Sequence, residues 1–83
     1  MNTILVEILK ERARQDQKWG VQNHSDERWY LILAEEVGEV AKSIVENDTE
    51  NLEYELIQVM AVVYAWLQIS KPEVLEKWRI SQK

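Results

Sequence analysis

The chain has 83 residues, of which 46% are hydrophobic and 30% charged, a composition typical of one small folded domain rather than a disordered segment. It contains no cysteine and one histidine, which excludes disulfides, thiolate metal sites and histidine-rich zinc sites. The net charge of −5 argues against binding to nucleic acids or anionic membranes. We expect a single soluble domain over residues 1–83, in the cytoplasm, because no signal peptide or membrane-spanning run is visible.

The first half of the chain predicts two helices. The first covers residues 3–18 and is stopped by Gly20, a residue that readily adopts the left-handed conformation at a helix end. The second begins after a cap at Ser25 or Asp26 and ends near Glu46. The turn-rich residues between the two helices predict a short connection.

The second half predicts a third helix over residues 49–69 and a short fourth helix over residues 73–80, with Pro72 placed just before it. No segment alternates polar and apolar residues over a useful length, so strands are not expected. The predicted fold class is therefore all-α. We expect an antiparallel bundle of three main helices plus a short C-terminal fourth.

The second helix carries a group of acidic residues beside its apolar arc. At 100° per residue, Glu36 falls at the edge of the arc, and Glu39 and Glu35 lie further round. Carboxylates three or four residues apart on a helix repel one another, and a bound cation would relieve that repulsion. Gly38, in mid-helix, indicates close approach of another backbone or a ligand. The arc itself consists of Trp29, Tyr30, Leu33, Val37, Val40, Ala41 and Ile44.

The third helix places Glu55 in the middle of an apolar stripe, with Gln58 one turn on at the flank. An unpaired carboxylate buried there would cost several kcal/mol or take up a proton. It therefore needs a cation, which is either a metal ion or a basic side chain such as Arg12. Arg12 and Asp16 are also spaced for an ion pair with each other, or for contact with a substrate.

The remainder of the third helix is apolar nearly all round, since only Gln58 and Gln68 are strongly polar over residues 56–69. Three short neighbours cannot cover such a helix in so small a chain. We therefore expect a homodimer or homotetramer that forms through apolar helix faces.

Two acidic motifs, Glu35-Glu36-x-x-Glu39 and Glu55-x-x-Gln58, predict a metal site. A spacing of three residues on each of two helices brings oxygen ligands onto facing surfaces. A set of hard oxygen ligands without histidine or cysteine favours Mg²⁺ or Mn²⁺ over zinc. Residues 35–55 hold eight acidic residues and one lysine, a balance that a solvated acidic segment would also show.

These motifs resemble the signature of the MazG-like all-α nucleoside triphosphate pyrophosphohydrolases, which is E-E-x-x-E, a connection, and then E-x-x-D. The resemblance covers about residues 7–69, including the run Arg14-Gln15-Asp16-Gln17-Lys18-Trp19-Gly20-Val21-Gln22-Asn23-His24-Ser25, which is similar to short single-domain members of phage and mobile-element type. One position departs from the signature, because the final aspartate is Gln58 here.

The resemblance implies Mg²⁺-dependent hydrolysis of a (deoxy)nucleoside triphosphate to the monophosphate and pyrophosphate. It implies catalytic roles for Glu35, Glu36, Glu39 and Glu55, with Glu36, Glu39 and Glu55 as metal ligands. Glu35 is a ligand, a neighbour of the ligands or the base that accepts the proton of the attacking water. Gln58 offers a carbonyl oxygen without charge, which makes it a weakened metal ligand.

Five further residues are candidates for substrate binding. The resemblance implies a substrate contact for His24, which would otherwise be a solvated loop residue. Trp19 and Trp29 either stack on a base or belong to the core. Lys18 and Arg28 are candidate phosphate partners, although most surface cations have no such role.

The departure at Gln58 keeps a second function open. In this alternative the chain is a non-catalytic helical oligomer whose degraded metal site serves a nucleotide-binding or interaction module.

Overall fold

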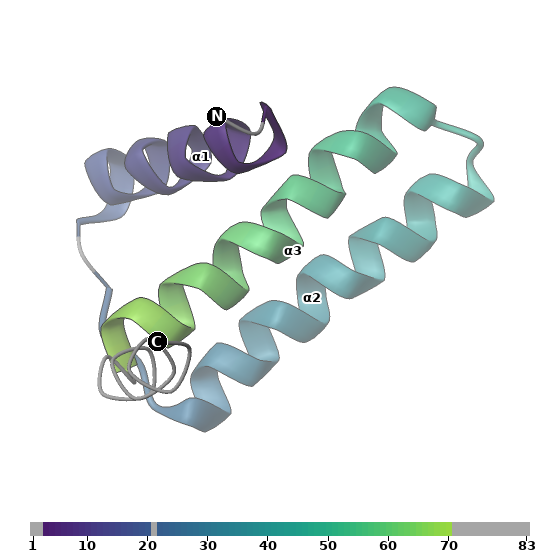
Figure 1. The fold of residues 1–83 in the computed structure, drawn as a ribbon. Helices are drawn as coiled ribbons and strands as arrows, with labels where there is room; N and C mark the ends of the chain where they lie inside the picture. The colour runs from purple at the N-terminus through teal and green to yellow at the C-terminus, as the bar shows by residue number, and fades with distance from the viewer. Residues whose placement is uncertain (1–2, 21, 71–83) are drawn as a thin grey trace, which may run out of the picture.

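The computed structural model describes residues 3–20 and 22–70. Within them the chain forms three helices and no strand: α1 (Thr3–Trp19), α2 (Asp26–Val45) and α3 (Thr49–Ser70) (Figure 1). The predicted all-α class and its three main helices are thus confirmed, while the predicted fourth helix lies outside the described residues. None of the three helices is long and apolar enough to cross a bilayer.

Local capping interactions set the ends of the helices. Gly20 ends α1 with a positive φ of 78°, and its N–H donates to the carbonyl of Asp16 at 2.8 Å. The hydroxyl of Ser25 accepts a first-turn N–H of α2 at 3.2 Å, and a carboxylate oxygen of Asp48 accepts one from α3 at 3.1 Å. Asn47 adopts a φ of 54°, which helps the chain reverse between α2 and α3.

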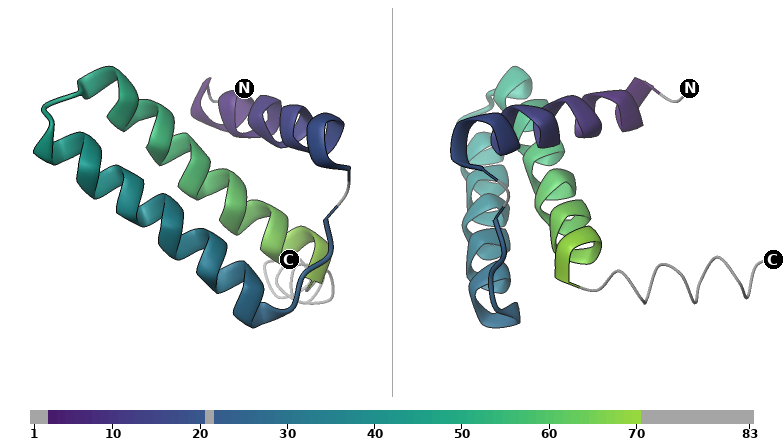
Figure 2. Two further views of the ribbon diagram at one scale, coloured as in Figure 1. Left: turned by 180° about the vertical axis from the view of Figure 1, so that it is seen from behind. Right: turned by 90° about the vertical axis from the view of Figure 1, so that its left-hand side faces the viewer.

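α2 and α3 lie side by side and antiparallel, and α1 runs across α3 rather than along it (Figures 1 and 2). Two interhelical hydrogen bonds join the ends of the α2–α3 pair. The indole N–H of Trp66 donates to Asp26 at 2.8 Å, and the side-chain amide of Asn51 donates to the hydroxyl of Ser43 at 2.6 Å. Among the described residues α1 packs against α3 and not against α2, so α3 is the central helix.

The core between α2 and α3 is small. Trp29, Val62 and Ala65 are its buried members, and Trp29 is only 2% exposed. Three partly buried side chains pack around them: Ile32, Leu33 and Trp66. A core of this size stabilises an isolated small domain only marginally.

A second apolar surface remains uncovered, which we call the open apolar face. It consists of Tyr30, Val37 and Ile44 on α2 and Leu56, Met60 and Leu67 on α3, each at least 38% exposed. An apolar pocket of about 310 Å³ between Leu33, Val63, Trp66 and Leu67 joins the two stripes. On α3 these positions lie about half a turn from Gln58, which contacts α1. The open apolar face therefore points away from α1. The apolar arc predicted for α2 is only partly buried, because α3 covers one side of it.

Gly38 does not show the close approach by another backbone that its mid-helix position indicated. It is exposed on α2, and a methyl group added at its Cα would meet no described atom within 4 Å. That expectation is therefore wrong for contacts among the described residues. Approach by a ligand or a second copy of the chain stays a prediction.

Candidate functional site

Glu36 of α2 and Glu55 of α3 face each other between the two antiparallel helices. Glu36 is half-buried because its position lies at the core edge of the α2 arc, beside Trp29 and Val40. Glu55 is 8% exposed because it stands two turns before Val62 on the core-facing stripe of α3. The helical pattern thus brings two acidic side chains from different helices to one point.

Their proximity changes the protonation of Glu36. Burial, a hydrogen bond with Glu55 and the negative charge of Glu55 raise the pKa of Glu36 to about 7, with smaller contributions from Glu39 and Glu35. Near neutral pH the pair therefore holds a proton that a divalent cation would displace. The other three acidic residues of the two predicted motifs are close enough to influence this carboxyl group.

Glu35 and Glu39 are exposed on α2 and flank the pair. Among the described residues, no three carboxylate or imidazole groups are grouped closely enough to form a complete metal site. Exposed glutamate side chains can rotate toward the pair, and carboxylate oxygens are the ligands that Mg²⁺ and Mn²⁺ prefer. The protonated pair and its donor set therefore fit a hard divalent cation that draws in at least one flanking acid.

Arg12 does not supply the charge that Glu55 requires. Its side chain is buried in α1, where one guanidinium nitrogen lies 2.6 Å from a carboxylate oxygen of Asp16 and another donates to Gln15 at 2.8 Å. None of the ion pairs between described residues includes Glu55. The predicted Arg12–Asp16 pair is present, and the predicted alternative of an Arg12–Glu55 salt bridge is not.

Gln58 lies in a hydrogen-bonded network that joins α3 to α1. Its carbonyl oxygen accepts a hydrogen bond from the side-chain amide of Gln15 at 2.8 Å, and the same Gln15 nitrogen donates to Glu11 at 2.8 Å. Glu11, in turn, accepts two hydrogen bonds from Arg14, at 2.9 and 2.6 Å. Sequence reasoning missed Gln15 and Glu11, because their importance depends on where α1 crosses α3.

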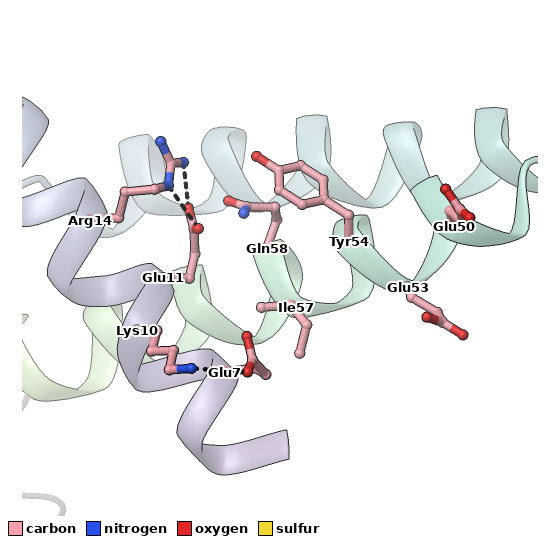
Figure 3. Close-up of a pocket in the computed structure, with 9 residues that line it drawn as sticks. All are labelled: Glu7, Lys10, Glu11, Arg14, Glu50, Glu53, Tyr54, Ile57 and Gln58. Atoms are coloured by element: carbon pink, nitrogen blue, oxygen red, sulfur yellow. Dashed lines mark hydrogen bonds and ion pairs between the residues drawn. The ribbon is translucent and has the colours of Figure 1, made fainter. Parts of the chain in front are cut away.

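A groove of about 390 Å³ opens beside this network, between α1 and the first half of α3 (Figure 3). In it the Lys10 and Glu7 side chains form an exposed ion pair at 3.5 Å, and Arg14 reaches toward Glu11. The groove therefore offers both charged and aromatic groups to a ligand. Its lining residues are Glu7, Lys10, Glu11, Arg14, Glu50, Glu53, Tyr54, Ile57 and Gln58.

Two of the predicted substrate-binding residues contact each other at the start of α2. The ring of His24 packs edge-on against that of Trp29, with centroids 4.9 Å apart and an interplanar angle of 69°. Trp29 is a core residue, whereas His24 is only partly buried. His24 is therefore the more accessible member of the pair.

The other three candidates lie on the surface. Trp19 is 62% exposed, and the ammonium group of Lys18 lies 4.8 Å from its ring centroid, within the range of a cation–π contact. Arg28 is exposed and lines the same surface depression as Glu35. Arg28 is thus the candidate cation that the structure places beside a motif acid.

Comparison with known proteins identifies one family. A family model described as MazG nucleotide pyrophosphohydrolase domain matches residues 24–77, more than half of the chain. The match includes His24, both acidic motifs and the whole α2–α3 pair. Searches against curated proteins and against solved structures found no match.

Proposed function

This chain belongs to the MazG nucleotide pyrophosphohydrolase family, and from that premise we propose that it hydrolyses a (deoxy)nucleoside triphosphate with the help of Mg²⁺. Water attacks the α-phosphorus, and the bond between the α and β phosphates breaks. The products are a nucleoside monophosphate and pyrophosphate. We place this activity in the cytoplasm, where nucleoside triphosphates are abundant.

The Glu36–Glu55 pair is the observation that carries the proposal. Two acidic side chains from facing helices share a hydrogen bond, and the pKa of Glu36 rises to about 7. An arrangement of this kind is unfavourable for stability alone, because neither acid has a described basic partner. Because the pair lies within the residues that match the family model, a metal site is the simplest physical reason for the arrangement.

Glu36, Glu39 and Glu55 would hold Mg²⁺, and Mn²⁺ would serve in its place. When bound, the ion offsets negative charge on the phosphates and lowers the pKa of the attacking water. Glu36 and Glu55 must first release the proton between them. Glu39 must turn toward the pair, which its exposed position on α2 allows.

Glu35 is the group that we assign as the base. It is exposed beside the pair, and it shares a surface depression with Arg28, a cation suited to hold a phosphate oxygen near it. We propose that His24, which is partly buried against Trp29, contacts the nucleoside. Trp19 and Lys18 stay predicted substrate contacts at the end of α1.

We also propose that the chain self-associates through the open apolar face. Met60 and Ile44 on that face are 50% and 59% exposed, and burying such side chains contributes roughly 25 cal/mol per Å² of apolar area. A second copy offers the same two stripes, so a symmetric pair of α2–α3 layers would form a four-helix interface. Either a dimer or a tetramer could use this interface.

A panel of nucleotides tests the function. The protein is incubated with each common NTP and dNTP plus Mg²⁺, and loss of triphosphate is followed with and without excess chelator. We expect consumption that stops in chelator and is lost in Glu36→Gln. The exposed Glu46→Gln is the matched control and should retain activity. Binding of nucleotide without any turnover would favour the non-catalytic alternative.

A further inference from the structure

The apolar pocket between α2 and α3 lies close to the end of α3. Its walls are Leu33, Val63, Trp66 and Leu67, its volume is about 310 Å³, and Leu67 is 38% exposed. At 1.5 Å per residue, Val63 and Leu67 lie about 10.5 and 4.5 Å before Ser70, the last residue of α3. Apolar walls that are open to water are unfavourable, so a side chain that fills the pocket would stabilise the fold.

The thirteen residues that follow α3, residues 71–83, are the C-terminal segment and lie outside the described part of the structure. Their sequence predicts a helix over residues 73–80. The family match continues to residue 77, so the domain of this family does not end with α3.

The predicted helix has one apolar side. At 100° per residue, Val74, Leu75 and Trp78 fall within an arc of about 100°. Ile80 falls on the opposite side. A helix of this pattern buries its arc against another apolar surface, and Trp78 is the largest side chain of the arc.

The connection after α3 brings this arc to the pocket. Pro72 disfavours the helical conformation in the residue before it, which predicts a turn directly after Ser70. Helices joined by a short connection usually pack as antiparallel neighbours. A helix that starts at residue 73 and returns along α3 carries Trp78 about 7.5 Å back from Ser70, between the levels of Val63 and Leu67.

Charge also favours the C-terminal segment as the occupant. It contains four basic and two acidic residues, although the whole chain has a net charge of −5. Lys77 and Arg79 lie on either side of its apolar arc. The start of α2, which lies beside the end of α3 (Figure 1), carries Asp26 and Glu27 in its first turn, so the described surface there attracts a basic segment.

We propose that residues 73–80 form a helix that folds back onto α3 of the same chain and inserts Trp78 into the apolar pocket between α2 and α3. The inference does not depend on the catalytic site. Docking would cover Leu67, at one end of the open apolar face, and leave the remainder, around Ile44 and Met60, to a second copy of the chain. The segment thus completes the core of each copy and limits the surface through which copies associate.

Engineered cysteines test the docking in the full chain, which has no cysteine of its own. Leu67→Cys with Leu75→Cys links the pocket to the apolar arc, and Leu67→Cys with Ile80→Cys is the matched control from the opposite side of the predicted helix. Each protein is oxidised at low concentration, and the products are separated by non-reducing electrophoresis. We expect a disulfide within one chain for the first pair, formed about tenfold faster than in the control.

Melting temperatures provide a second measurement. Trp78→Ala empties the pocket, whereas Ile80→Ala removes an apolar side chain from the opposite side of the same helix. We expect Trp78→Ala to lower the melting temperature by about 5 °C or more and Ile80→Ala to leave it nearly unchanged.

Three results would overturn the proposal. A disulfide that joins two chains would show that the segment of a second copy occupies the pocket. Equal rates for the two cysteine pairs would show that the arc does not face the pocket, and this comparison holds even if Trp78→Ala does not fold. A folded Trp78→Ala protein that melts as the wild type does would show that Trp78 does not fill the pocket.

Discussion

Glu36 and Glu55 are two acidic side chains, from antiparallel helices, that share a hydrogen bond and have no described basic partner. A pair of this kind is stable only while it keeps a proton or gains a cation. Its chemistry therefore links protonation, metal binding and folding stability, and each link can be measured separately.

The first prediction concerns pH. The pKa of Glu36 rises from 4.5 to about 7 in the folded chain, so the folded state keeps a proton that the unfolded chain releases. The stability from this proton is complete below about pH 4.5 and is lost as the pH rises through about 7. Thermal melts without metal should show this loss in the wild type and not in Glu36→Gln. Identical profiles for the two proteins would contradict the assignment.

Bound metal should restore the folding stability that is lost as the pH rises. At pH 8 the pair is ionised and open to a cation, whereas at pH 5 Mg²⁺ must compete with a proton. We expect Mg²⁺ with a non-hydrolysable nucleotide to raise the wild-type melting temperature more at pH 8 than at pH 5. A melting temperature that Mg²⁺ and the nucleotide leave unchanged at both pH values would count against bound metal.

Glu55→Gln should lower turnover about a hundredfold or more without weakening the fold. The change removes a carboxylate that faces another carboxylate and leaves no basic group unpaired, so the metal-free melting temperature at pH 8 should be equal or higher. Glu46→Gln, on an exposed position at the end of α2, is the control. A destabilisation of a few kcal/mol in Glu55→Gln would reveal a core ion pair instead.

Gln58→Asp restores the carboxylate of the family signature. The added charge should lower the Mg²⁺ concentration for half-maximal rate and should change the rate at saturating Mg²⁺ less. Titrations of rate against Mg²⁺ for the wild type and the variant measure both effects. A lower melting temperature with an unchanged half-maximal Mg²⁺ concentration would mean that the site does not use a charge at this position.

The open apolar face yields a prediction about assembly. We expect the wild type to be an oligomer, and Met60→Glu, which places a charge in the middle of this face, should yield a monomer of lower melting temperature. Leu9→Glu, on a 38% exposed position of α1, adds the same charge elsewhere and should leave the oligomer intact. Sedimentation velocity distinguishes the two, and an oligomeric Met60→Glu protein would rule out this face as the interface.

The sequence predicts those features that depend on local pattern. The stop at Gly20, the cap at Ser25 and the ion pair between Arg12 and Asp16 follow from spacing along one chain segment, and the structure confirms them. The core-facing position of Glu55 follows equally from helical periodicity and is confirmed by its 8% exposure.

Features that depend on how helices cross were not predictable in this way. The Gln15–Gln58 hydrogen bond exists because α1 meets α3 at that level, and nothing in the periodicity of either helix specifies the crossing. The exposure of Val37 on the predicted apolar arc has a similar origin, since α3 covers only one side of α2. Gly38 is a different case. Its mid-helix position predicted close approach of another backbone, but no described atom lies within 4 Å of a methyl group placed at its Cα.

Phosphorus NMR of the reaction products tests the central claim most directly. The wild-type protein is incubated with Mg²⁺ and the triphosphate that it consumes fastest, and the products are identified as they form. We predict nucleoside monophosphate and pyrophosphate in equal amounts, and no reaction in excess chelator. Nucleoside diphosphate and orthophosphate, or undiminished turnover in chelator, would contradict the account.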